Sequence, residues 1–181
     1  QFDTAPGEDR VGKDGVEQFA CAGCAGSGQS QYAELHQMIS LPNQQARVRQ
    51  PTLSADGRVL AWVADSARGD ANVFVLELAT GRPLTPALLN SPDEDVAPAL
   101  SADGRYLLFT SDRGGGSDLY GFDLHAGAFL AMARFNGLGE ESDPRMLGAR
   151  DGGLSFVRDD GDGDGNGDGP RLIVQAIAAW K

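Results

Sequence analysis

Apolar and polar residues alternate in short runs along most of this chain, and glycine-containing turns separate the runs. An Asp-Gly pair supplies the positive-φ residue that a tight hairpin turn needs, and the flanking Val, Leu, Trp and Phe favour a pleated, buried surface. From Pro51 onward this pattern predicts a short first strand, an Asp56-Gly57 turn and two longer strands, at Thr52–Ser54, Val59–Val63 and Val73–Leu78.

The same unit occurs three times. Pro51, Pro98 and Pro144 open the copies and lie 47 and 46 residues apart, a period typical of β-propeller blades of about four strands. The strands predicted in the later copies are Tyr106–Thr110, Leu119–Leu124, Leu154–Val157 and Leu172–Ala178. Weaker fourth strands are expected near Leu84–Leu88 and Phe129–Arg134, whereas the third copy shows no fourth strand of its own.

The predicted fold is therefore all-β, a partial or small β-propeller of about three four-stranded blades. The blades are expected at 51–97, 98–143 and 144–181, after an irregular N-terminal arm over 1–50. Tyr32–Leu41 fits a short helix or a strand, and it is the upstream segment with enough apolar character to close the third blade. If nothing covers it, an open sheet edge as long as the predicted strand Leu172–Ala178 promotes aggregation.

The second copy carries the motif L-S-A-D-G-R-Y-L-L-F-T-S-D-R, followed by S-D-L-Y-G-F-D-L. This motif resembles the repeat of TolB-type, WD-like β-propellers of the bacterial cell envelope. The resemblance covers about residues 51–135 strongly and 144–178 weakly. It implies the fold but carries over no functional residue, because the repeated Asp, Gly and Arg form turns and lock strands.

TolB-type rings have six blades, so the resemblance does not say how three blades would form a closed ring. Two chains could associate into one ring, Gln1–Gln50 could supply an irregular fourth blade, or an open stack could dock on a larger partner. The partner expected on these grounds is a protein assembly or a second copy of the chain.

The net charge of the chain bears on its binding partners, and the length of its apolar runs bears on its location in the cell. A net charge of −11 and a pI near 4.4 disfavour binding to nucleic acid and to anionic lipid. No apolar run approaches the roughly 20 residues of a transmembrane helix. The first 20 residues are too polar for a signal-peptide core. The expected location is extracytoplasmic, in the periplasm or at the cell surface, with any signal already removed.

An aspartate-rich loop between two predicted strands is the sharpest chemical signal. Alternate carboxylates that wrap around one centre suit Ca²⁺, which takes six to eight oxygen ligands. Arg171 stands where an EF-hand has its bidentate Glu, so the spacing is closer to the calcium loops of integrin-type propellers. The alternative is a solvated hairpin tip. The predicted ligands are Asp160, Asp162, Asp164, Asn166 and Asp168.

Cys21 and Cys24 are the two cysteines of the chain. Ala25 follows the second cysteine, where a c-type haem attachment needs His, and a zinc site would need two further ligands. No apolar run precedes the pair, as a lipoprotein cleavage site would require. A short-loop disulfide in an oxidising compartment and two free thiols are the interpretations that remain favoured.

No catalytic set is apparent, because the two histidines lie in separate segments and no Ser/His/Asp arrangement accompanies them. Two acidic loops, Asp93–Asp95 and Glu140–Asp143, each precede a repeat proline and suggest either solvated loops or a cation-attracting rim. Asp65, Asp112, Arg68 and Arg113 are expected to bond neighbouring strands.

The sequence thus predicts a non-enzymatic binding or structural subunit of an envelope or surface assembly, without a catalytic residue. A calcium-dependent adhesion or glycan-binding module is the first alternative. A small hydrolase or lyase that uses the acidic rim is the second.

Overall fold

The computed structural model describes residues 16–18, 37–39, 47–66, 68–147, 152–161 and 169–176. The chain divides into two units, Gln1–Gln45 and Ala46–Lys181. In the first unit, β1 (Val16–Gln18) pairs antiparallel with β2 (Gln37–Ile39). β2 lies within Tyr32–Leu41, so the described part of that segment is a strand. Its use as a closing strand for the third blade stays a prediction.

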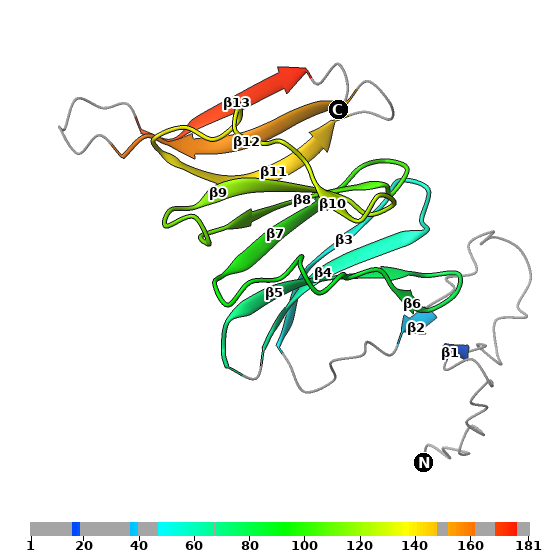
Figure 1. Ribbon diagram of the computed structural model, residues 1–181. Coiled ribbons are helices and arrows are strands. Elements are labelled where there is room, and N and C mark those ends of the chain that lie inside the picture. Colours follow the sequence, from blue (N-terminus) through cyan, green and yellow to red (C-terminus); the bar gives the residue numbers. More distant parts are fainter. Residues whose placement is uncertain are drawn as a thin grey trace, which may run out of the picture. The chain divides into compact units, whose positions relative to one another are not determined.

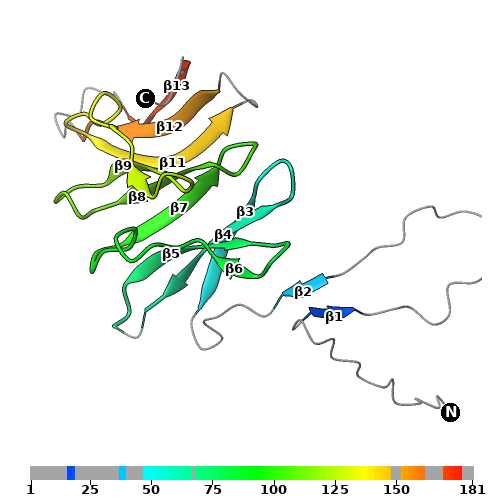
Figure 2. The ribbon, with the colours of Figure 1, turned by 45° about the vertical axis from the view of Figure 1, so that its right-hand side comes forward.

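Three antiparallel sheets make up the described part of the second unit, and each is one blade (Figures 1 and 2). Blade 1 contains β3 (Val48–Leu53), β4 (Val59–Asp65), β5 (Ala71–Glu77) and β6 (Arg82–Pro83). Blade 2 contains β7 (Asp95–Leu100), β8 (Tyr106–Ser111), β9 (Asp118–Asp123) and β10 (Ala128–Phe129). Blade 3 contains β11 (Glu140–Leu147), β12 (Gly153–Asp159) and β13 (Arg171–Ala176). The predicted all-β fold with three blades is confirmed, and no helix in the described part of the chain could cross a membrane.

The weak fourth strands differ from the prediction. In blade 1 the strand is Arg82–Pro83 rather than Leu84–Leu88, and in blade 2 it ends at Phe129. Pro83 and Pro86 have no amide to donate to a ladder, which limits the strand in blade 1. Beyond Pro83, a side chain replaces the backbone as the hydrogen-bond acceptor at the edge of β5, because the amide of Val75 donates to Oγ1 of Thr85 at 2.7 Å.

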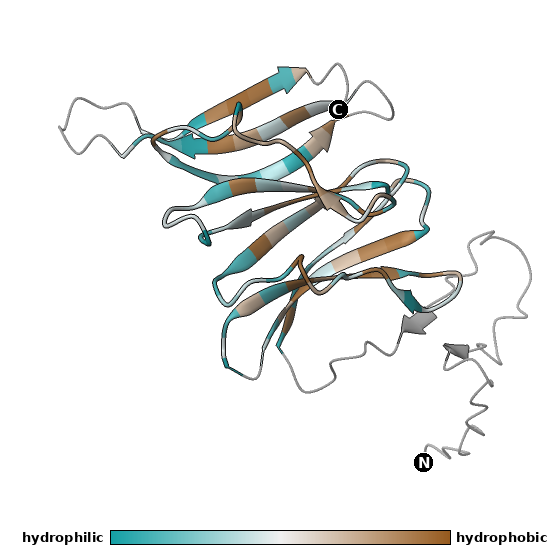
Figure 3. Ribbon diagram, in the orientation of Figure 1, coloured by the Kyte–Doolittle hydropathy of each residue, from teal (hydrophilic) through white to brown (hydrophobic). Residues whose placement is uncertain are grey.

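Alternation along the strands directs apolar side chains to both faces of the middle blade. One buried cluster joins blades 1 and 2 and includes Val63, Val73 and Phe109. A second joins blades 2 and 3 and includes Leu108, Phe135 and Phe156. Figure 3 shows the hydrophobic bands that cross the strands of all three sheets. Burial of these two faces is the main force that stacks the blades.

A buried ion pair attaches blade 2 to blade 1. Arg113 donates from Nη2 to Oδ1 of Asp95 at 2.6 Å and to the carbonyl of Leu89 at 2.7 Å. The amide of Ser91 donates to Oδ2 of the same Asp95 at 2.8 Å. Leu89 and Ser91 belong to the last loop of blade 1, so the pair holds that loop to the first strand of blade 2.

The next blade repeats this arrangement. Arg158 donates from Nε to Oε1 of Glu141 at 2.7 Å and from Nη2 to the carbonyl of Phe135. The amide of Gly137 donates to the same Glu141 oxygen at 3.0 Å. Asp95 and Glu141 were expected in acidic loops, yet both are fully buried because an arginine neutralises each of them. They therefore do not belong to an exposed acidic rim.

Candidate binding groove

The first strand of every blade is irregular at the repeat proline. The pairing register shifts between Arg49 and Thr52 in β3, with equivalent shifts in β7 and β11. Proline cannot donate to a ladder, and a β-bulge is one of the few places within a sheet where it is tolerated. The three bulges therefore follow from Pro51, Pro98 and Pro144.

The residue before each proline has a left-handed backbone. The φ angles are 52° at Gln50, 52° at Ala97 and 49° at Asp143. Residues other than glycine rarely adopt this conformation, and it costs about 1 kcal/mol or more at each position. Such strain persists where the surrounding structure imposes it, and it often accompanies functional sites.

The bulges meet along one side of the blade stack and line a groove of about 360 Å³. The amide of Ala97 donates to Oε1 of Gln50 at 2.9 Å, which joins the bulges of the first two blades. Strand β7 packs against β3, and β11 packs against β7, so the three first strands are neighbours. The lining residues are Gln50, Pro51, Thr52, Ala97, Pro98, Ala99, Asp143 and Arg145.

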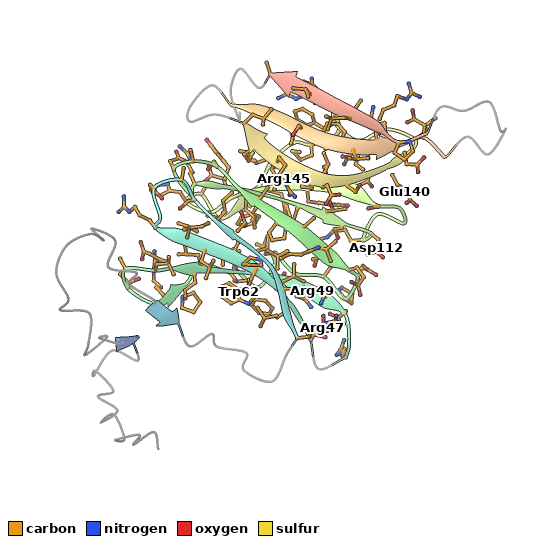
Figure 4. All side chains as sticks on the ribbon, turned by 180° about the vertical axis from the view of Figure 1, so that it is seen from behind. Arg47, Arg49, Trp62, Asp112, Glu140 and Arg145 are labelled. Atoms are coloured by element: carbon orange, nitrogen blue, oxygen red, sulfur yellow. The ribbon has the colours of Figure 1, made fainter. Side chains whose placement is uncertain are left out.

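The groove combines an apolar floor with charges at one end. Pro98, Ala97 and Ala99 are buried, whereas Asp143 and Arg145 are exposed. Figure 4 shows Arg145 on β11. Arg145 donates from Nη1 to the carbonyl of Pro144 at 3.1 Å and forms no ion pair with any residue that the structure describes. As far as the described residues go, the remaining N–H groups of its guanidinium can donate to an anionic or carbonyl group. The lining includes one hydroxyl, on Thr52, and one carboxylate, on Asp143, and none of the lining residues is Ser, Cys or His.

Most residues of the predicted metal and cysteine sites lie outside the described residues. This holds for Asp162, Asp164, Asn166 and Asp168, and for Cys21 and Cys24. Asp160 is described, and its Oδ2 accepts a hydrogen bond from Nη2 of Arg171 at 2.6 Å. Within the described ranges, no three His, Cys, Asp or Glu side chains are placed to hold a metal ion. Calcium binding stays a prediction.

Sequence reasoning missed the groove, although one signal for it was available. The fixed spacing of the prolines indicates repetition, and the predicted first strand, Thr52–Ser54, begins after Pro51. The observed β3 starts at Val48 and includes Pro51, and a proline within a strand is tolerated at a bulge. The charged residues beside Pro144 are exposed on that bulge.

Comparison with known proteins places the fold. No protein-family model and no curated protein sequence matches the chain. TolB from Acinetobacter baumannii is similar in structure, with 21% identity and a TM-score of 0.55 over 75% of this chain. A putative TolB from Agrobacterium tumefaciens gives 15% and 0.53 over 79%. The described blades have the fold of TolB-type β-propellers.

The β-propeller domain of the Trilobed protease from Pyrococcus furiosus shares the same fold, with 14% identity and a TM-score of 0.52 over 75% of this chain and 40% of that one. The chain spans 31% of the first TolB and 52% of the second. The resemblance to the TolB-type repeat is thus confirmed at the level of the fold.

Proposed function

We propose that the protein is a non-enzymatic binding module that receives an extended segment of a partner protein in the groove at its proline bulges. The observation that carries this proposal is the convergence of three strained bulges on one groove that ends in Asp143 and in Arg145, which has no ion-pair partner among the described residues. Its volume lies near the lower end of the roughly 300–1,000 Å³ of ligand pockets.

The chemistry of the groove suits an extended polypeptide. A peptide in that conformation offers alternating carbonyls and amides, which Arg145 and the side chain of Gln50 can bind. Apolar side chains of the peptide would pack on the proline and alanine floor. Asp143 and Arg145 together favour a segment with a basic and an acidic residue two positions apart, because charges of opposite sign steer recognition.

The enzymatic alternative loses two of the carboxylates on which it would rest, whereas Asp93, Glu94, Glu140 and Asp143 are exposed. A hydrolase or lyase on an acidic rim needs accessible carboxylates from neighbouring blades. Asp95 and Glu141 are buried in ion pairs with Arg113 and Arg158, and they act as links between blades.

A location in the cell envelope fits the likeness to the TolB structures and the strongly negative charge of the chain. We therefore propose an extracytoplasmic protein that acts within a larger assembly. Calcium in the loop that begins at Asp160 remains a separate proposal, and a calcium-dependent adhesion module would follow from it.

Selection of peptides from a displayed random library on the full chain tests the groove. Peptides that bind it should lose at least about tenfold in affinity for Arg145→Glu. They should bind Arg82→Glu unchanged, because Arg82 is an exposed arginine on β6 outside the groove. Binding that is equally strong to both variants, or a selection that enriches no peptide, would refute the proposal.

A further inference from the structure

The groove contains two junctions between successive proline bulges, and a side chain bridges the first of them. Between blades 1 and 2, the amide of Ala97 donates to Oε1 of Gln50 at 2.9 Å. Gln50 stands before Pro51 as Ala97 stands before Pro98, so the residue before one repeat proline binds the amide of the residue before the next. A carboxamide oxygen is therefore the group that the chain itself places on this amide.

The second junction, between blades 2 and 3, has the same backbone geometry. Asp143 stands before Pro144, and its φ angle of 49° matches the 52° of Ala97. The pairing register shifts at the equivalent place in β7 and in β11, and β11 packs against β7. We therefore expect the amide of Asp143 to face blade 2 as the amide of Ala97 faces blade 1.

The second junction differs in the residue that could bridge it. Ala97 stands where Gln50 stands in the first junction, and its methyl group cannot accept a hydrogen bond. In the part of the chain that the structure describes, no side chain accepts the amide of Asp143. Ala97, Ala99 and Asp143 all line the groove, so a ligand in the groove can reach this place.

Charge decides which acceptor suits the second junction. The carboxylate of Asp143 is exposed at the same bulge, and the chain has a net charge of −11, so a carboxylate of the ligand would be repelled. A carboxamide carries no charge and has both an acceptor and two donors. Its oxygen can accept the amide of Asp143 while its nitrogen donates to the carboxylate of the same residue.

We propose that the second junction binds the side-chain carboxamide of a glutamine or an asparagine in the partner segment. This inference rests on the proposed function, because it names one residue that the bound segment should carry. The carboxamide takes the place that the side chain of Gln50 holds in the first junction. Ala97 and Ala99 leave space for it, since neither side chain extends beyond Cβ.

Peptides selected on the full chain from a displayed random library give the first test. They should be enriched in glutamine or asparagine at one position. Replacement of that glutamine by methionine, which has a similar length but no amide, should weaken binding about two- to tenfold. Replacement by glutamate should weaken binding at least as much, because the carboxylate of Asp143 repels it.

A charge-removing variant separates the contribution of the carboxylate from that of the amide. Asp143→Asn keeps the backbone amide, and asparagine tolerates the left-handed conformation. On this variant the preference for glutamine over glutamate should shrink, whereas the preference for glutamine over methionine should persist. Asp93→Asn removes an exposed carboxylate outside the groove lining and should leave both preferences unchanged.

Hydrogen exchange tests the junction without a peptide. In the parent chain the amide of Ala97 should exchange more slowly than that of Asp143, and Gln50→Met should remove the difference. Ala97→Gln supplies the missing carboxamide from within the chain, so it should slow exchange at Asp143. Ala97→Met, which has a similar length and no amide, should not.

The possible results distinguish this inference from the proposed function. Peptides that depend on Arg145 but show no preference for glutamine or asparagine would overturn the carboxamide site and leave the groove proposal intact. Equal protection of the Asp143 and Ala97 amides in the parent chain would also overturn it, because the chain itself would then fill the second junction. A selection that enriches no peptide would refute both.

Discussion

The buried pair between Arg158 and Glu141 gives the most exacting test of how the blades are held together. Glu141 is 0% exposed, and its Oε1 accepts hydrogen bonds from both Nε of Arg158 and the amide of Gly137. Replacement of Arg158 by Met removes the neutralising charge but leaves the carboxylate buried. Loss of one partner of a buried pair costs about 3–5 kcal/mol.

The structure provides a matched control in an exposed pair. Arg82 lies 3.5 Å from Glu77, and its side chain is 68% exposed. Exposed pairs contribute about 0–1 kcal/mol, so Arg82→Met should have little effect. For a chain of this length, the loss expected for Arg158→Met corresponds to a decrease in Tm of roughly 6–20 °C.

Urea denaturation of the full chain, followed by tryptophan fluorescence and circular dichroism, measures these free energies. Arg158→Met should cost at least about 3 kcal/mol, and Glu141→Gln should cost less because Arg158 keeps its bond to the carbonyl of Phe135. The double variant should be more stable than the sum of the two single effects predicts, by about 0.5–3 kcal/mol. Additive losses, or an Arg158→Met variant as stable as Arg82→Met, would refute the proposed link between the blades.

Three further predictions follow from individual residues. First, Gly57 and Gly104 both have φ near +70°, but a Cβ at Gly104 would lie 2.6 Å from Cγ2 of Val59, whereas nothing lies within 4 Å at Gly57. In the same urea assay, Gly57→Ala should lower the free energy of unfolding by about 1–2 kcal/mol because of backbone strain, and Gly104→Ala should lower it by about 1–3 kcal/mol more. Equal losses would contradict the packing of the second turn on blade 1. Second, burial alone would raise the pKa of Asp123, but the Arg105 side chain and the amides of Ala126 and His125 hold it below its ordinary value. Asp123 should therefore stabilise the fold above about pH 4 and lose that contribution as the pH falls through its lowered pKa. The free energy of unfolding of Asp123→Asn should be lower than that of the parent chain at pH 6, and the difference should shrink toward zero near pH 2. A difference that does not change with pH would contradict this. Third, millimolar Ca²⁺ should raise the Tm of the chain, and Asp164→Asn should remove the shift; no shift at several millimolar would argue against a structural ion.

The turns and the strands beside them were predictable because their causes are local. Asp56-Gly57 and Asp103-Gly104 form turns in which glycine adopts the positive φ that the sequence predicts. The alternation of apolar residues placed β4, β5, β8 and β9 within two residues of their observed bounds. In β4 and β8 the continuous apolar runs agree with the burial of both faces.

The links between blades and the groove were not predictable in the same way, because they depend on residues from separate strands. Glu141 and Arg158 are 17 residues apart, and nothing local shows that the carboxylate is buried. The guanidinium of blade 2 comes from Arg113, just beyond β8, whereas that of blade 3 comes from within β12. The positive charge therefore occupies an equivalent place in the two folded blades, although the arginine that carries it stands at different positions in the two repeats.

Blade 3 is built like its neighbours, but none of the described residues covers its outer strand β13. Residue-resolved hydrogen exchange of the amides of Val73, Leu119 and Leu172 measures this. The amides of Val73 and Leu119 bond to Asn90 and Asn136, so they should exchange orders of magnitude more slowly than the amide of Leu172. Equal protection at all three amides would contradict the uncovered edge that the described residues leave at β13.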